Sequence, residues 1–191
     1  MILRIKWPGD REEALEYMVG LITGDGVIEK YRVEVYDKSE AFLRLVKTVV
    51  LEKYLHDTIS SIRIDYRKRV NGYRLRVYGR EFVNKIKDYY EPPLSINFIR
   101  GFFDAEGSIW YNPNLIAEIT NKNLKLLEKI KQVLQQHGIN SKIHQDRSTY
   151  KVRMTTMRRF MEIIGLRHPR HIAKITCSLN SYEKAFLRKQ I

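Results

Sequence analysis

Two apolar stretches of closely similar pattern open the two halves of this sequence. Apolar residues at helical spacing run through YMVGLITGDG (17–26) and again through FIRGFFDAEG (98–107), and each stretch ends in an acidic residue followed by glycine. Each residue of the first stretch has its counterpart 81 positions later, which pairs Asp25 with Glu106. The repetition predicts two similar units within one chain.

The polar and apolar positions that follow each stretch also repeat. VEVYDKSE (33–40) and AEITNKNL (117–124) each lead into an amphipathic pattern. This pattern predicts helices over about 39–54 and 122–137, and the alternation after them predicts the strand pairs 62–69 with 73–78 and 142–147 with 149–155. Asn71-Gly72 is typical of a tight hairpin between the first two strands. A further helix closes each half, and the second half is expected to add a C-terminal helix to about Lys189.

These elements predict an α+β fold of two αββαββα halves with antiparallel sheets. Pro92-Pro93 stops a helix and stiffens a short connector, so we expect an N-terminal half at 1–91 and a C-terminal half at 92–191. Because both copies lie in one chain, the sequence favours a monomer with internal pseudo-twofold symmetry over a homodimer.

Small residues on one face of each opening helix indicate that the two helices touch. Gly20 and Gly24 are four residues apart, as are Gly101 and Ala105, so each pair shares a helical face without bulk. The alternative interpretation is that such a face serves close packing alone and has no catalytic or binding role. The glycines that follow the acids, at positions 26 and 107, are expected to cap the helices in the left-handed conformation.

An acidic residue at the end of each helix favours a functional role for the helix contact over packing alone. Asp25 and Glu106 carry the wrong sign for a helix C-terminus, and local rules tend to be broken at functional sites. If the helices pack, these carboxylates lie side by side, with the carbonyl oxygens of Gly24 and Ala105 directed into the same space. Such an oxygen-only set suits Mg²⁺, and divalent ions beside phosphodiesters support in-line displacement.

The two stretches resemble the two copies of the motif that defines the LAGLIDADG homing endonucleases, and the resemblance extends over nearly the whole chain. The resemblance implies motif helices packed at the interface and two four-stranded sheets that form a DNA-binding saddle. It also implies Asp25 and Glu106 as essential metal ligands, with two or three Mg²⁺ ions for which Mn²⁺ substitutes. Members of the family cut both strands of a long, asymmetric target across the minor groove and leave 3′ overhangs.

Family members also place polar or basic groups near the scissile phosphates. By position the candidates are Asp37, Lys38, Asn121 and Lys122 at the strand ends, and Arg167, Arg170 or Lys174 near the C-terminus; of these, Lys38, Lys122 and Lys174 are predicted to be catalytic. The sequence departs from the pattern at two positions, since some relatives carry Gln at the position of Asp37 and Lys at the position of Ile109.

The charge of the chain points to a polyanionic partner. There are 35 Lys and Arg against 22 Asp and Glu, a net charge of +13, and residues 62–80 hold seven basic side chains and one acid. Strand alternation places basic residues on one face of each ribbon, and a two-stranded ribbon fits the major groove. An ordinary solvated sheet face is the alternative, but such a face mixes both signs. The predicted DNA-binding residues are Arg63, Arg67, Arg69, Arg74, Arg76, Lys142, His144, Lys151 and Arg153.

Several classes of protein are excluded or remain as rivals. The apolar runs are short and interrupted by charge, so no membrane span is predicted, and one cysteine, Cys177, allows no internal disulfide. A cytoplasmic, nucleoid-associated location is expected. The rivals are an RNA maturase that binds intron RNA and a non-cleaving DNA-binding protein on the same fold. Degenerate relatives are expected to lose a carboxylate, and this chain keeps both.

Overall fold

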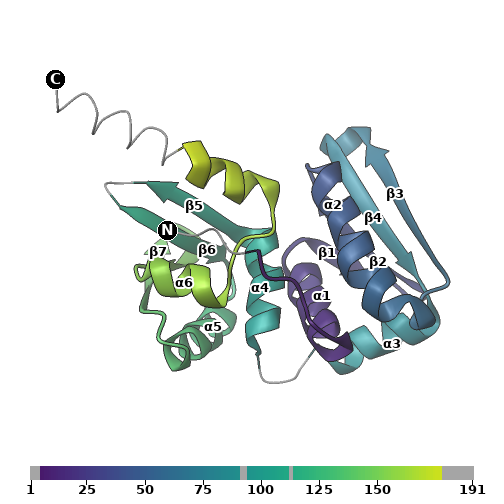
Figure 1. The fold of residues 1–191 in the computed structure, drawn as a ribbon, viewed down its shortest axis with the longest axis horizontal. Coiled ribbons are helices and arrows are strands. Elements are labelled where there is room, and N and C mark those ends of the chain that lie inside the picture. Colours follow the sequence, from purple (N-terminus) through teal and green to yellow (C-terminus); the bar gives the residue numbers. More distant parts are fainter. Residues whose placement is uncertain (1–4, 91–93, 112–113, 178–191) are drawn as a thin grey trace.

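A computed structural model describes residues 5–90, 94–111 and 114–177 of the chain. The two motif helices, α1 (Arg11–Asp25) and α4 (Ile96–Glu106), lie side by side in the centre with one sheet on each side (Figure 1). The predicted α+β architecture is therefore confirmed. The predicted boundary between 91 and 92 and the predicted helix end near Lys189 lie outside the described residues.

Each half contains one four-stranded antiparallel sheet with the same topology. The first has the order β1-β2-β4-β3, from β1 (Gly26–Ile28), β2 (Arg32–Asp37), β3 (Ser61–Arg67) and β4 (Gly72–Tyr78). The second has the order β5-β6-β8-β7, from β5 (Gly107–Tyr111), β6 (Leu115–Asn121), β7 (Ser141–Asp146) and β8 (Thr149–Met154). Identical strand orders in the two halves match the repeat seen in the sequence.

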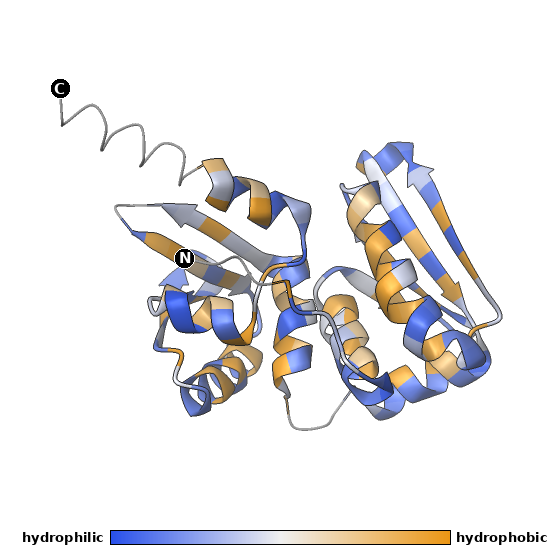
Figure 2. Ribbon diagram, viewed as in Figure 1, coloured by the Kyte–Doolittle hydropathy of each residue, from blue (hydrophilic) through white to orange (hydrophobic). Residues whose placement is uncertain are grey.

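Helices cover the apolar face of each sheet. In the first half these are α2 (Glu40–Val46), which continues as the π-helix Lys47–Leu55 and a short 3₁₀ turn, and α3 (Arg80–Asp88). In the second half they are α5 (Leu124–Gln136) and α6 (Met157–Ile163). Orange and blue bands alternate along the strands in Figure 2, because alternate side chains face the helices and the open side. In the described part of the chain, none of the helices has both the length and the hydrophobicity that a membrane crossing requires.

Local sequence fixes where the motif helices begin. Asp10 caps α1, because its carboxylate accepts a hydrogen bond from the backbone N–H of Glu13 at 2.9 Å. Ser95 caps α4 in the same way through the N–H of Phe98 at 3.1 Å. The two helices end at equivalent positions, Asp25 and Glu106, whereas α1 begins about one turn earlier than α4 relative to the repeat.

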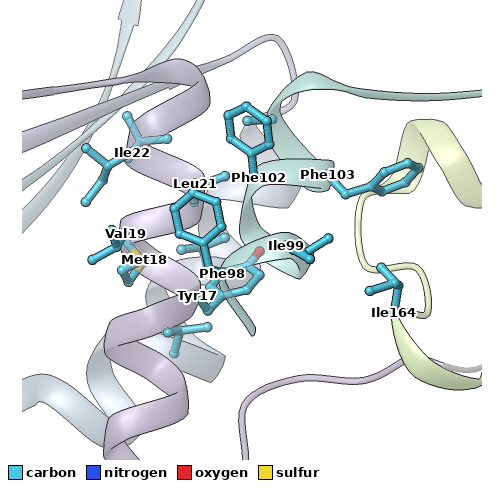
Figure 3. Packing of buried hydrophobic residues seen from close by; sticks show 14 of the residues in the cluster. Tyr17, Met18, Val19, Leu21, Ile22, Phe98, Ile99, Phe102, Phe103 and Ile164 are labelled. Atoms are coloured by element: carbon cyan, nitrogen blue, oxygen red, sulfur yellow. The ribbon is translucent and has the colours of Figure 1, made fainter. Parts of the chain in front are cut away.

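Backbone atoms of the two motif helices approach each other as the small residues predict. A Cβ atom added at Gly20 would lie 2.0 Å from the carbonyl oxygen of Phe98, and one added at Gly101 would lie 2.0 Å from the carbonyl oxygen of Tyr17. No real side chain tolerates such contacts, so both positions require glycine. Figure 3 shows the apolar side chains packed around this contact, with Phe103 directed away from α1 towards Ile164.

The prediction of left-handed caps at positions 26 and 107 is wrong. Both glycines are extended, with φ of −127° at Gly26 and −77° at Gly107, and each begins a strand directly after its helix. Glycine is needed at both positions because any side chain would clash with neighbouring atoms. A Cβ at Gly26 would lie 2.7 Å from the Cα of Ile22, and one at Gly107 would lie 2.2 Å from the carbonyl oxygen of Phe103.

Candidate active site and nucleic-acid interface

The contact between the motif helices brings Asp25 and Glu106 together. A Cβ added at Gly24 would lie 2.4 Å from the Cβ of Ala105 and 3.1 Å from the Cγ of Glu106, so the residue after Gly24 stands beside the Glu106 side chain. Both acidic side chains are half-buried at the ends of their helices. Residues 81 positions apart thus form one acidic pair, in the arrangement that the paired motifs predict.

The surroundings of this pair disfavour two negative charges. Burial raises the pKa of the Asp25 carboxyl; the Arg170 guanidinium opposes this shift, and the charge of Asp37 adds to it. Burial likewise raises the pKa of Glu106, and the charge of Asp25 raises it further, while Asn121 and Arg170 lower it. A bound cation would relieve the repulsion, and this is the electrostatic signature expected of a cation site.

The donor atoms at the pair suit a hard cation. Asp25 and Glu106 supply carboxylate oxygens, and backbone carbonyls supply further oxygen atoms. One of the two predicted carbonyl ligands, that of Ala105, accepts a hydrogen bond of 2.6 Å from Nη2 of Arg170. Within the described ranges, no cluster of three or more Asp, Glu, His or Cys side chains is arranged to hold a metal ion.

The strand ends beside the acids differ between the two halves. Asn121 donates a hydrogen bond from Nδ2 to Oε1 of Glu106 at 3.4 Å. Its counterpart Asp37 instead contacts Nε2 of His168 through Oδ2 at 3.0 Å and accepts from the N–H of Ser39 at 2.6 Å. An open pocket of about 310 Å³ lies on this side, and its wall is formed by Asp25, Tyr36, Asp37, Lys38, Val70, Gly72, Tyr73 and Arg170.

The predicted basic groups occupy different environments. Lys38 is exposed and lines the pocket beside Asp25, whereas Lys122 and Lys174 are exposed and do not line it. Arg167 is fully buried, and its guanidinium forms an ion pair of 2.5 Å with Asp104. Arg167 is therefore a structural residue, and its candidacy as a phosphate-side group is wrong. Ile109 is fully buried in β5, so this strand position carries no positively charged side chain.

The open face of the first sheet carries four of the predicted DNA-binding residues. Arg63 and Arg76 are register partners on β3 and β4, and Arg67 and Arg74 lie on the same face. Arg63 and Arg67 are exposed, while Arg74 is only 8% exposed. Arg69 is exposed but lies in the 3₁₀ turn Lys68–Val70, so its predicted place on the strand face is wrong; the turn begins before the hairpin residue Asn71, whose φ is 47°.

Acidic residues share this face, which corrects the expectation that it is almost purely basic. Glu34 on β2 pairs with Arg74 at 3.1 Å and with Arg32 at 2.9 Å. Asp65 pairs with Arg74 at 3.1 Å and with Arg76 at 2.8 Å. The discrepancy arises because β2 pairs directly with β4 and brings a carboxylate from outside residues 62–80 onto the face.

The second sheet repeats the arrangement. Glu118 on β6 lies 3.2 Å from Arg153 and 3.6 Å from Lys151, and Lys151 also pairs with Asp146 at 2.7 Å. Lys142 and His144 on β7 are exposed beside them as register partners of Arg153 and Lys151. In each half, a nearly buried glutamate thus forms ion pairs with two basic side chains on the open face of the sheet.

Comparisons with known proteins agree with this architecture. The family model of the LAGLIDADG-like domain matches residues 93–165, and that of the WhiA LAGLIDADG-like domain matches residues 14–73. Homing endonuclease I-DmoI of Desulfurococcus mucosus is 30% identical over 146 residues, which cover 68% of this chain and 73% of the relative. The uncharacterized protein MJ0398 of Methanocaldococcus jannaschii is 28% identical over 144 residues, 68% of this chain, and the match spans only 51% of that relative.

A solved structure gives the same result in three dimensions. The crystal structure of I-DmoI in complex with DNA and Mn superposes with a TM-score of 0.65 at 27% identity, covering 81% of this chain and 97% of the other. Two motif helices in contact, flanked by two sheets of identical topology, define the class. The chain belongs to the LAGLIDADG homing endonuclease family.

Proposed function

We propose that this protein is a metal-dependent homing endonuclease that cuts both strands of a long, asymmetric DNA duplex and leaves 3′ overhangs. The observation that carries the proposal is the pair formed by Asp25 and Glu106, in which burial raises both pKa values. The relative I-DmoI, whose structure was solved with DNA and Mn, has the same fold. A monomer with two non-identical halves suits a target without sequence symmetry, and such a nuclease would act at the nucleoid in the cytoplasm.

The chain's own residues would bind, orient and stabilise the reacting groups. Asp25 and Glu106 would hold divalent ions, two or three Mg²⁺ with Mn²⁺ as a substitute, together with the carbonyl oxygens of Gly24 and Ala105. These ions would supply Lewis-acid stabilisation of the phosphate charge. Lys38, which lines the same pocket as Asp25, would contact a phosphate. Lys122 and Lys174 do not line this pocket, and their catalytic roles stay predictions.

The two sheets would contact the DNA duplex on both sides of the cleavage site. Exposed Arg63, Arg67, Lys142 and His144 are the groups most accessible to DNA. Arg74, Arg76, Lys151 and Arg153 are held by carboxylates, which fixes their poses before binding. Because several phosphates would be neutralised, affinity should fall steeply as salt rises.

A cleavage assay tests the proposal. Sites cut by the wild type would be selected from a random duplex library in Mg²⁺, and the same substrates would be incubated in EDTA. We expect double-strand breaks only with the metal, and none with Asp25→Asn or Glu106→Gln, while both variants still bind the site. Glu128→Gln is the matched control, since it makes the same acid-to-amide change at an exposed position on α5. Undiminished cutting by either site variant would refute the ligand assignment.

The second candidate is a DNA-binding protein that does not cleave. The match of residues 14–73 to the WhiA LAGLIDADG-like domain supports it. The two candidates give different results in the same assay. A binding protein would retain the duplex in a gel-shift experiment and leave both strands intact at every Mg²⁺ or Mn²⁺ concentration.

A further inference from the structure

The chain after α6 returns to the acidic pair and is held there by four polar side chains. Figure 1 shows this segment running past the end of α4 to the helix at 169–177. The buried guanidinium of Arg167 pairs with Asp104 of α4 and also donates to the carbonyl oxygens of Lys6, at 2.9 Å, and Arg100, at 3.1 Å. These contacts fix the segment against both the N-terminus and the second motif helix.

Two histidines fix the same segment on either side of Arg170. His168 is 2% exposed and contacts Asp37 of the first half at 3.0 Å. Its Nδ1 accepts a hydrogen bond of 3.0 Å from the backbone N–H of Arg170. Nε2 of His171 lies 3.0 Å from the carbonyl oxygen of Gly107, and burial lowers the pKa of this histidine to about 3. The backbone of residue 170 is therefore anchored to both halves.

The Arg170 side chain projects from this anchored backbone onto the end of α4. Its Nη2 donates to the carbonyl oxygens of Asp104 at 2.7 Å and Ala105 at 2.6 Å. Its charge lowers the pKa of both acids of the pair. The residue is nevertheless exposed, and it lines the open pocket with Asp25 and Lys38. The guanidinium is thus both ordered and accessible to a ligand.

Among the residues that the structure describes, this arrangement occurs on one side only. Residues 165–177 follow α6, whereas α3, the counterpart of α6, leads within a few residues to α4. The described part of the first half accordingly has no equivalent of Arg170. The pocket that Arg170 lines belongs to the side of Asp25, Asp37 and Lys38, and not to the side of Asn121.

We infer that Arg170 is a catalytic residue for one of the two strand cleavages, and that its guanidinium binds the scissile phosphate lying over the Asp25 pocket. The inference rests on the proposed nuclease function. A guanidinium offers paired donors to phosphate oxygens and stays protonated, so it stabilises charge that grows in the transition state. Arg170 supplies a positively charged side chain at the site, whereas the buried Ile109 of β5, where some relatives carry Lys, is apolar.

In the assisted step a water oxygen forms a bond to phosphorus as the P–O3′ bond breaks. One proton of the water passes through solvent to O3′, and the phosphate remains on the 5′ side as a monoester. Arg170 exchanges no proton in this step. To reach the phosphate, the guanidinium leaves the carbonyl of Ala105, which frees that oxygen for another ligand.

Strand-resolved cleavage tests the inference. A duplex selected with the wild type would carry different labels on its two strands, and single-turnover rates would be measured for each strand. In Arg170→Met we expect one strand to be cut about 100-fold more slowly, so that nicked duplex accumulates, while the other strand is cut at nearly the wild-type rate. Arg170→Lys keeps a point charge and should regain part of the lost rate.

DNA binding without metal gives an independent readout. In EDTA, the slope of log affinity against log salt should be smaller by about 1 in Arg170→Met, because one phosphate contact is lost. Arg158→Met is the control with the same charge change, since the Arg158 side chain is 93% exposed on α6, and it should alter neither strand rate. Melting curves would verify that each variant is folded. If Arg170→Met does not fold, the strand rates of Arg170→Lys are compared with those of the wild type instead.

The outcomes separate this inference from the proposed function. Equal slowing of both strands, or no slowing of either, in a folded Arg170 variant would overturn the inference alone. A wild type that binds but cuts no strand would overturn the nuclease proposal, and the inference with it.

Discussion

The contact between the motif helices predicts a large penalty for the smallest possible side chain at Gly101. In Gly101→Ala the new Cβ would lie 2.0 Å from the carbonyl oxygen of Tyr17 and 2.8 Å from the backbone N of Leu21. Real Cβ contacts are not shorter than 3.0 Å, so the backbones of α1 and α4 must separate by about 1 Å. Neither clashing atom belongs to a flexible side chain, and the strain therefore cannot be relieved by a rotamer change.

The net effect on stability follows from two opposing quantities. Overpacking in a rigid contact costs up to about 3 kcal/mol, while replacing a helical glycine by alanine returns about 1 kcal/mol. The free energy of unfolding should fall by about 2 kcal/mol, which lowers the melting temperature by roughly 4–8 °C for a chain of this size. Because the same separation moves Asp25 away from Glu106, cleavage should slow by about 100-fold.

Urea unfolding followed by circular dichroism would measure the change in stability. Gly9→Ala is the matched control, since a Cβ there meets nothing closer than Oε2 of Glu13 at 3.6 Å, and we expect it to be neutral. A Gly101→Ala protein with wild-type stability and wild-type cleavage would show that the helices do not touch as described.

Three further perturbations test other parts of the structure. In metal-free buffer Asp25→Asn should stabilise the protein by about 1 kcal/mol at pH 7. The raised pKa of Asp25 means that the wild type loses stability as pH rises above the ordinary carboxyl range, so the gain should vanish near pH 3 in melting experiments. Arg167→Met leaves Asp104 buried and unpaired and should lower the free energy of unfolding by about 3–5 kcal/mol, whereas the double variant with Asp104→Leu should recover much of it. Glu34→Gln removes one of the two carboxylates that hold Arg74, so binding to random DNA should tighten and discrimination against single mismatches should shrink in competition assays; unchanged discrimination would contradict the positioning role.

The fold and the acidic pair could be predicted because the responsible signals are local and occur twice. The small residues at 20, 24, 101 and 105 lie at helical spacing, and an acid ends each motif. Twofold repetition converts a weak pattern into a prediction about contact between distant segments. The predicted cap conformation at Gly26 was wrong because Gly26 begins β1 and packs against the backbone of Glu34 on β2, a contact that the sequence alone does not reveal.

The polar contacts around the pair could not be predicted because they join distant positions without a repeat. His168 and Asp37 are separated by 131 positions, and Arg170 contacts Ala105 across 65. The carboxylate of Glu34 was missed for a related reason, since β2 reaches the basic strands only through the order of the sheet. Three basic candidates near the C-terminus were equivalent in sequence, and burial alone separates Arg167 from Arg170 and Lys174.

Calorimetric titration of the DNA-bound protein with Ca²⁺ tests most directly whether Asp25 and Glu106 together hold a divalent cation. The wild type should bind the metal, and Asp25→Asn and Glu106→Gln should each weaken binding by about 100-fold or more, because both carboxylates contribute ligands to one site. Glu128→Gln should titrate like the wild type. Wild-type metal affinity in both site variants would contradict the account.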